Sequence, residues 1–357
     1  MQNRQSIKSK GKFFIKRKKT AKPIAPANEK GSFPNYMRKE IFTQPQLIDG
    51  LLERYIRADK IDFDFLKIKI DKIKRIYIVG SSEDYGCVLA GAYNFEVLVD
   101  IPAIPVLMSE FIYSNPILDK STLVIVIGNK TNEHCNAVIN RANTGGARII
   151  AVFDFDTENG YAISLDFNEK GAVSTAGYSL KYITISLLAL YFGEKNQVVT
   201  ELYIKIATKM LRSLGDKIKY VLESEYLIKH ILQKTDENRL LLTGTNVDFA
   251  SAIYGAHLLS FAYSKDIYAI PASELKNLKR KSGNIIGYAS NESFYDILVK
   301  SANDCLQIIP KNIKTNTVDF IDYDDTIPLL NPVLGAVVTQ LMAYNIAIDN
   351  KIITDKQ

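Results

Sequence analysis

Two short apolar stretches of this sequence run directly into glycine and small polar residues. Arg75–Val79 (RIYIV) leads into Gly80-Ser81-Ser82, and 239–243 (RLLLT) leads into Gly244-Thr245-Asn246. A helical pattern follows each turn. Because a helix N-terminus offers free backbone N–H groups and the positive end of the helix dipole, an anion is the expected ligand. The spacing therefore predicts two helix N-termini that could hold a negatively charged group.

The residues that usually ligate metals or act as nucleophiles are few and scattered. No CxxC pair is present, the cysteines are odd in number, and no histidine lies at metal-ligand spacing from a carboxylate. This pattern argues against a disulfide framework, a zinc site or another bound cofactor, and favours reduced thiols. The residues concerned are Cys87, Cys135, Cys305, His134, His230 and His257.

Helical and strand patterns alternate along most of the chain. A helix is expected over 36–58, with Pro45 either breaking it early or marking a helix start. Fully apolar runs at Thr122–Ile127 and Arg148–Phe153 predict central strands of a parallel sheet. The same alternation of strand and helix patterns begins again after residue 238. We therefore expect a duplicated α/β, doubly wound, flavodoxin-like domain that binds ligands at the carboxyl ends of its strands. Further helices are expected at 84–99, 132–143, 179–193, 197–232, 248–263 and 327–349, and further strands at 105–108, 285–289 and 306–309.

Charge is distributed unevenly along the 357 residues. The formal net charge is +6, but residues 1–32 alone carry ten Lys or Arg against one acid, which leaves −3 for the remainder. We interpret the start of the chain as a basic disordered tail, either solvated or an electrostatic arm for RNA, anionic lipid or an acidic partner. There is no secretory signal pattern and no apolar run long enough to cross a bilayer, so a cytoplasmic location is expected.

Several segments resemble one known family. Tyr36–Pro45 (YMRKEIFTQP) is similar to the segment that opens the isomerase domain of glucosamine-6-phosphate synthase. Gly80-Ser81-Ser82 stands where that family has Gly-Thr-Ser, and the order of the matches is kept along 36–349. The other matching segments are Phe95-Glu96, Ile101-Pro102, Ser109-Glu110-Phe111, Val173-Ser174-Thr175 and Ala272-Ser273-Glu274-Leu275-Lys276.

The resemblance implies two SIS (sugar isomerase) domains that pack as a homodimer and bind a sugar phosphate such as fructose-6-phosphate or glucosamine-6-phosphate. It divides the chain into a tail (1–35), a first SIS domain with an N-terminal helix (36–196) and a second with linking helices (197–357). A separate glutaminase or synthase chain is an implied partner. The implied substrate-binding residues are Gly80, Ser81, Ser82, Asn129, Lys130, Thr131, Ser174, Thr175 and Glu274.

The departures from the family pattern concern its chemistry. The family's acid–base pair corresponds to Leu258 and Phe261, and its histidine corresponds to Asn277; none of these can exchange a proton near neutral pH. Its serine-rich phosphate loop corresponds to 128–133, where Lys130 and Thr131 still offer a charge and a hydroxyl. Residues 1–36 contain no cysteine for glutaminase chemistry, and Lys356 lies too early to match the family's Schiff-base lysine.

These losses favour a non-catalytic sugar-phosphate sensor or a regulatory relative of the synthase. Two alternatives stay open. One is an active phosphosugar isomerase or deglycase that uses displaced residues. The other is a nucleic-acid or membrane tether directed by the basic tail. Candidate displaced residues for the enzyme are Glu83, Asp84, His257, Glu274 and Lys276.

Overall fold

The computed structural model describes residues 30–129, 132–153, 162–232, 240–278, 284–302 and 304–356. Most of the predicted tail, residues 1–29, therefore lies outside the described residues. Asn35, at the end of that predicted tail, is buried and begins the fold. Its side chain accepts a hydrogen bond from the backbone of Arg38 and caps the first helix, as asparagine commonly does at this position.

The first half of the chain builds a five-stranded sheet in which every pair is parallel. The strand order is β4-β3-β5-β6-β7. Its central strand β5 is buried along its whole length, as the unbroken run of β-branched and apolar residues requires. The strands are β3 (Arg75–Gly80), β4 (Ala103–Leu107), β5 (Thr122–Gly128), β6 (Arg148–Phe153) and β7 (Ala162–Ser164).

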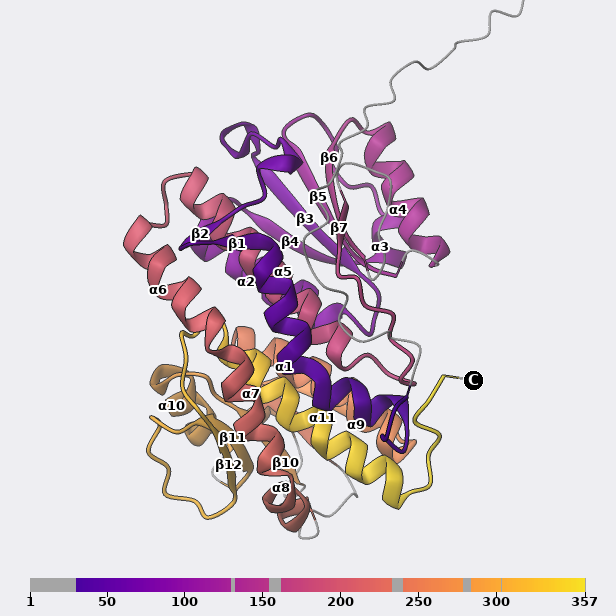
Figure 1. Cartoon of the computed structure of the whole chain (residues 1–357), viewed down its shortest axis with the longest axis vertical. Helices are drawn as coiled ribbons and strands as arrows, with labels where there is room; N and C mark the ends of the chain where they lie inside the picture. Colours follow the sequence, from indigo (N-terminus) through magenta and orange to yellow (C-terminus); the bar gives the residue numbers. More distant parts are fainter. Residues whose placement is uncertain are drawn as a thin grey trace, which may run out of the picture.

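Helices cover both faces of this sheet (Figure 1). Alternate residues of the strands join one of two apolar cores, because side chains alternate across a strand. One core contains α2 (Tyr85–Val99) and α5 (Ala176–Lys195). The other contains α3 (Met108–Tyr113) and α4 (Glu133–Thr144).

The second half repeats the same plan. The order of its parallel sheet is β9-β8-β10-β11-β12. In both sheets the second strand in sequence lies at one edge, followed by the first, third, fourth and fifth. This confirms the predicted α/β class with parallel sheets flanked by helices. The strands are β8 (Leu241–Gly244), β9 (Tyr268–Pro271), β10 (Ile285–Tyr288), β11 (Leu306–Pro310) and β12 (Phe320–Tyr323).

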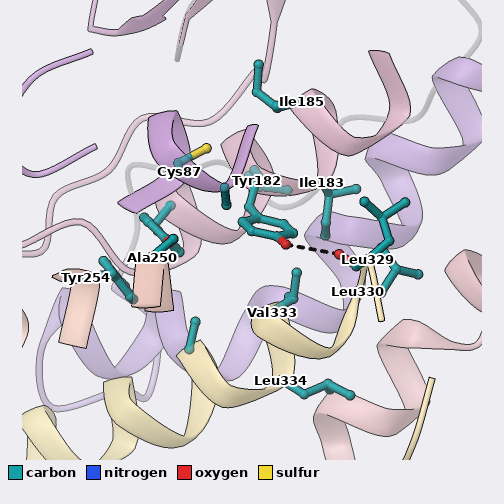
Figure 2. Close-up of a cluster of buried hydrophobic side chains, with 14 of the residues drawn as sticks. Cys87, Tyr182, Ile183, Ile185, Ala250, Tyr254, Leu329, Leu330, Val333 and Leu334 are labelled. Carbon is teal, nitrogen blue, oxygen red and sulfur yellow. Dashed lines mark hydrogen bonds between the residues drawn. The ribbon is translucent and has the colours of Figure 1, made fainter. Parts of the chain in front are cut away.

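The two halves share one continuous core. α9 (Val247–Tyr263) and α11 (Asn331–Asp349) cover the inner face of the second sheet and join α2 and α5 in the same apolar cluster. Figure 2 shows part of it, where the hydroxyl of Tyr182 on α5 donates to the backbone oxygen of Leu329, 3.0 Å away. The outer face of the second sheet is covered by α10 (Glu292–Ser301) and the 3-10 helix η3 (Ala272–Asn277).

The remaining elements wrap around this core. They are α1 (Tyr36–Tyr55), the hairpin β1 (Ile56–Arg57) and β2 (Lys60–Ile61), the short 3-10 helices η1 (Asp64–Leu66) and η2 (Ile70–Lys72), and the linking helices α6 (Glu201–Arg212), α7 (Leu214–Glu223) and α8 (Glu225–Leu232).

The expectation that Pro45 breaks or starts a helix is wrong. α1 continues through Pro45, which is buried in its middle. A proline there leaves the carbonyl oxygen of Ile41 without its usual backbone donor. The side-chain amide of Gln44 supplies the missing bond, with 3.0 Å between its Nε2 and that oxygen. A side chain thus replaces the backbone hydrogen bond that the proline removes.

α11 is the one helix of the described residues long and apolar enough to cross a membrane by length and composition. Of its most apolar window, 94% is buried inside the protein, where it covers the second sheet. A core helix of a soluble protein has the same character, so this helix is weak evidence for a membrane span. All three cysteines are buried, and none of them forms a disulfide.

Candidate functional site

A cavity of about 710 Å³ lies where the two halves meet at the carboxyl edge of the first sheet. The turn after β3 and the segment before α5 form one wall. α9 and the residues after it form the other. The volume is in the range of small-molecule sites. The lining residues are Glu83, Ala172, Val173, His257, Ser260, Phe261, Ser264, Lys265 and Asp266.

One face of α9 supplies the second wall. Ser260 and Phe261 come three and four positions after His257, which places the three residues on one stripe of the helix. Ser260 fixes the chain that follows the helix, because its Oγ accepts a hydrogen bond from the backbone nitrogen of Ile267 at 2.9 Å. The stripe therefore presents His257, Ser260 and Phe261 to the cavity, and Ser264, which caps the end of α9, also lines it.

Two titratable side chains face the cavity from opposite walls. Partial burial raises the pKa of Glu83 above its usual value, and the nearby Asp84 carboxylate adds to the rise. Burial lowers the pKa of His257, against a smaller opposing influence of Asp84. Both pKa shifts favour the uncharged form of the side chain, because burial disfavours a charge.

A buried ion pair lies close to this wall. Asp84 and Lys181 are 1% and 3% exposed, and 2.9 Å separates Asp84 Oδ1 from Lys181 Nζ. Ser81 donates to the other carboxylate oxygen of Asp84 at 3.1 Å. The pair joins the start of α2 to α5, so it fixes the turn that carries Glu83.

The predicted glycine turn after β3 lies beside the cavity. Gly80 ends the strand, and a Cβ at this position would lie 2.5 Å from Cγ2 of Val88. Ser81 is half-buried and bonds Asp84, whereas Ser82 is exposed. Neither serine lines the cavity; the next residue, Glu83, does.

The predicted phosphate loop is described only in part. Asn129 follows β5 and its backbone oxygen accepts a hydrogen bond from Asn132, which caps α4. Lys130 and Thr131 lie outside the described residues. The structure therefore places Asn129 at the same sheet edge as the glycine turn.

Ser174 and Thr175, which are neighbours in sequence, have different surroundings. The Ser174 hydroxyl is buried and has no hydrogen-bond partner. Thr175 is fully buried, and its backbone nitrogen and hydroxyl both donate to the carboxylate of Glu169. Ser174 does not line the cavity, but it follows the lining residue Val173. Because buried polar groups are almost always paired, its hydroxyl is a better candidate for an additional hydrogen bond than that of Thr175.

The structure does not bring Glu274 to the cavity. Glu274 lies on η3 beside the second sheet, is exposed, and accepts a hydrogen bond from Asn277 at 2.8 Å. At the two positions predicted to correspond to the family's acid–base pair, Leu258 is fully buried and Phe261 lines the cavity. The cavity is thus present, but the side chains at those positions are apolar.

Sequence reasoning missed the contacts by which three residues shape the cavity wall; of the three, it considered only Lys356, and for a different role. The carboxylates of Glu40 and Glu169 accept hydrogen bonds from the backbone nitrogens of Gly171 and Thr175, in the segment before α5. Lys356 donates to the backbone oxygen of Glu169 at 3.1 Å. Its partner is 187 residues away, and no local pattern in the sequence signals such a contact. Within the described residues, no group of three or more His, Cys, Asp or Glu side chains could hold a metal ion.

Comparison with known proteins finds a family match within the first half of the chain. Residues 69–191 match the family described as "SIS domain". The first α/β half contains an SIS domain. The match covers the first sheet and its inner helices α2 and nearly all of α5.

Curated relatives match over nearly the whole chain. Glutamine–fructose-6-phosphate aminotransferase [isomerizing] of Clostridium tetani is 28% identical over 93% of this chain and 59% of its own length. The protein of that name from Thermus thermophilus is 25% identical over 90% of this chain and 57% of its own length. The chain thus spans about three-fifths of these relatives.

Solved structures show which part is shared. The C-terminal domain of glucosamine-fructose-6-phosphate aminotransferase from Francisella tularensis superposes with a TM-score of 0.82 at 18% identity, covering 91% of this chain and 99% of that one. Tagatose-6-phosphate ketose/aldose isomerase from Escherichia coli gives 0.72 at 12% identity, covering 91% and 96%. The chain is homologous to the C-terminal, isomerase half of the aminotransferases, and these neighbours share its fold.

Proposed function

We propose that the cavity between the SIS domain and α9 binds a sugar phosphate, and that the chain is a non-catalytic sensor or regulatory relative of the aminotransferases. The observation that carries this proposal is the cavity itself, at the carboxyl edge of a parallel sheet, where doubly wound folds bind ligands. The buried, unpartnered Ser174 hydroxyl beside Val173 supports it. The names of the relatives mention fructose-6-phosphate.

The non-catalytic part of the proposal depends on the α9 wall. Leu258 and Phe261 cannot accept or donate a proton, and Asn277 is exposed on η3 and bonded to Glu274. A ligand held here would lack acid–base groups at those positions. Binding would then serve to report sugar-phosphate concentration rather than to convert it.

Thermal shift measurements test binding. Fructose-6-phosphate, glucosamine-6-phosphate and UDP-N-acetylglucosamine are titrated, with free fructose as the unphosphorylated control. A ligand at 100 times its Kd stabilises the folded state by about 2.7 kcal/mol. We expect a saturable rise in Tm with a phosphorylated sugar and none with fructose. The absence of any rise with all three phosphorylated ligands would contradict the proposal.

A matched pair of serine variants locates the site. Ser174 and Ser186 both carry buried hydroxyls without a partner, but Ser186 lies about three turns into α5. Ser174→Ala should weaken ligand binding about tenfold, the scale of one lost hydrogen bond. Ser186→Ala should leave the affinity unchanged. Equal effects of the two variants would place the ligand elsewhere.

One observation favours a second candidate, an active phosphosugar isomerase with displaced residues. Glu83 and His257 line the same cavity from opposite walls, and their pKa values shift in opposite directions, as in many acid–base pairs. A coupled assay of ketose and aldose phosphate interconversion separates the candidates. If the wild type interconverts these sugar phosphates and both Glu83→Gln and His257→Asn abolish the turnover, the chain is an enzyme and the sensor proposal is wrong.

Three further properties are proposed with the sensor. The second α/β half is proposed to be another SIS domain, with the domains divided at residues 196 and 197. The chain is proposed to act as a cytoplasmic homodimer and to offer a docking surface to a separate glutaminase chain. Analytical ultracentrifugation of the purified chain tests the pairing; a monomer at all concentrations would exclude it.

A further inference from the structure

The start of α5 holds a carboxylate that belongs to the chain itself. Oε1 of Glu169 accepts hydrogen bonds from the backbone nitrogens of Thr175 and Gly177, at 2.5 and 3.1 Å. The Thr175 hydroxyl lies 3.4 Å from the same oxygen. Because a helix start has unpaired N–H groups and the positive end of the helix dipole, it is a favourable place for an anion. Glu169 therefore occupies the position that a bound anion would take.

The position fits a carboxylate closely. Glu169 is 8% exposed, and a Cβ added at Gly177 would lie 2.5 Å from its Oε2 and 3.0 Å from its Cδ. Gly177 lies in the first turn of α5 and its φ is not positive, so the glycine provides space here rather than an unusual backbone conformation. The carboxylate of Glu169 fills that space.

A further donor lies beside this carboxylate. The Ser174 hydroxyl oxygen is 3.1 Å from the point where a Gly177 Cβ would be, and Oε2 of Glu169 is 2.5 Å from the same point. Ser174 is 6% exposed, and its hydroxyl has no hydrogen-bond partner. Two backbone N–H groups and the hydroxyls of Thr175 and Ser174 thus surround one buried place, and the Ser174 hydroxyl is still available for a further bond.

Two other helix starts at the carboxyl edges of the sheets also carry buried carboxylates, but these have different partners. Asp84 precedes α2, and Asp248 lies in the first turn of α9. Asp84 pairs with the Lys181 ammonium, and Asp248 accepts hydrogen bonds from the nitrogen and hydroxyl of Ser290. Of the three carboxylates, Glu169 is the one that takes the N–H groups of a helix start.

This helix start belongs to the cavity wall. Ala172 and Val173, which lie between Glu169 and the donors at the start of α5, line the cavity. The charge of Glu169 reaches the cavity, because it repels the carboxylate of the lining residue Glu83. A ligand in the cavity therefore meets the negative charge of Glu169 at this wall, where an unoccupied helix start would present a positive one.

We propose that the start of α5 is an anion-binding position that the chain fills with Glu169, and that this resident carboxylate keeps the phosphate of a ligand away from the cavity wall. The wall then meets the uncharged hydroxyls of the sugar. The part that concerns the ligand rests on the proposed sugar-phosphate function. Glu169 acts as a specificity-determining residue, because its charge decides which end of a phosphorylated sugar faces the wall.

Rescue by acetate tests the anion position without any sugar. Glu169→Ala removes a CH2–COO− group, and acetate supplies the same carbon and oxygen atoms. Urea unfolding of the full chain is followed in sodium acetate and in acetamide, an uncharged molecule of the same shape, at constant ionic strength. We expect acetate to lower the unfolding equilibrium constant of Glu169→Ala in a saturable way, about tenfold at ten times its Kd, and acetamide to change it less than about twofold.

Three further variants show whether the response belongs to this position. Glu169→Gln keeps the shape of the side chain, so the position stays filled and acetate should have no effect. Glu53→Ala removes an exposed glutamate of α1 and should not respond either. In Glu169→Ala combined with Gly177→Ala, the new Cβ takes the place of the carboxylate and should abolish the rescue. If Glu169→Ala does not fold by itself, its refolding yield in acetate against acetamide gives the same reading.

Competition in Glu169→Ala tests the consequence for the ligand. Acetate binding is followed by the broadening of its methyl NMR signal, in the presence of fructose-6-phosphate or of free fructose. Once the resident carboxylate is removed, a phosphate can reach the donors at the start of α5. We therefore expect fructose-6-phosphate to raise the apparent Kd of acetate, about tenfold at ten times its own Kd, and free fructose to leave it unchanged.

The outcomes separate the two proposals. If acetate and acetamide affect Glu169→Ala equally, or if the double variant retains the rescue, the inference is overturned. If acetate rescues the variant but fructose-6-phosphate binds without displacing acetate, Glu169 does not control the place of the phosphate, and that part is overturned. If acetate rescues the variant and fructose-6-phosphate binds to neither form of the protein, the anion position stands, and the proposed ligand is wrong together with the part that rests on it.

Discussion

At the residue scale, the chemistry of this protein depends on polar groups held away from water. Asp84 and Lys181 form a buried pair next to the cavity, and Glu40, Glu169 and Asp248 are buried carboxylates. Each costs free energy to bury and is retained through specific hydrogen bonds. Such groups respond strongly to substitution, so they give sharp tests of the structure.

The Asp84–Lys181 pair predicts an uneven response to mutation. Lys181→Met leaves a buried carboxylate without its cation and should cost about 3–5 kcal/mol of the free energy of unfolding. The double variant Asp84→Asn with Lys181→Met removes both charges and should recover most of this loss. Urea unfolding measures both. A single variant as stable as the wild type would show that the pair is solvated.

Asp248 predicts a pH-dependent stability. Its Oδ2 accepts hydrogen bonds from the Ser290 nitrogen and hydroxyl, at 2.7 and 3.0 Å, and burial raises its pKa to about 7. The wild type therefore loses stability as pH rises from about 4 to 7. The free energy of unfolding of Asp248→Asn, relative to that of the wild type, should therefore increase over this pH interval and then level off. A constant difference across denaturant titrations at several pH values would contradict the burial of this carboxylate.

At the element scale, most helices and central strands could be predicted from their apolar patterns. β5 and β6 lie where continuous β-branched runs placed them, and α9 begins one residue before its expected start. β7 and β9 were not predicted, because three- and four-residue edge strands carry too little pattern. The course of α1 through Pro45 was also missed, since it depends on a side-chain bond that no local propensity signals.

That compensation in α1 gives a direct prediction. Gln44 Nε2 bonds the Ile41 oxygen at 3.0 Å and the Gln340 side chain on α11 at 2.7 Å. Gln44→Leu leaves two buried acceptors unpaired and should cost about 2–4 kcal/mol in thermal or urea unfolding. Thr43→Ala removes a half-buried side-chain bond to the Lys39 oxygen and should cost about 1 kcal/mol or less. Equal losses would mean that Pro45 needs no replacement donor.

At the scale of the whole molecule, the two α/β halves are joined by shared helices rather than by a linker alone. α2, α5, α9 and α11 contribute to one apolar core, and Gln340 on α11 donates to the Tyr254 hydroxyl and to the Thr175 backbone oxygen at 3.0 Å. The Tyr178 and Tyr254 rings stack across the two halves, with centroids 3.4 Å apart. Figure 1 shows these central helices between the two sheets.

The shared core predicts cooperative unfolding. Loss of either half exposes the apolar face of the other, so both should unfold in one transition. The chain has no tryptophan, and tyrosine fluorescence with far-UV circular dichroism provides two probes. We expect coincident urea transitions. Two separated transitions would show that the halves are stable independently.

The candidate site could be predicted only in outline. The glycine turn after β3 and the Val173–Thr175 segment lie at the expected sheet edge, because strand ends and helix starts are encoded locally. The role of Lys356 depends on a contact with a residue 187 positions away. Thr175 and Glu274 form hydrogen bonds with residues only six and three positions away, but no motif marks these pairs. No spacing in the sequence indicates that Glu169 binds the Thr175 amide or that Lys356 reaches the cavity wall.

The central claim is that a phosphorylated sugar occupies the cavity between the SIS domain and α9. The most direct measurement is a crystal structure of the full chain soaked with fructose-6-phosphate. We expect sugar density between Glu83, Val173 and His257, with an oxygen of the ligand within hydrogen-bond distance of the Ser174 hydroxyl. An empty cavity at saturating ligand, or density bound at another surface, would contradict the account.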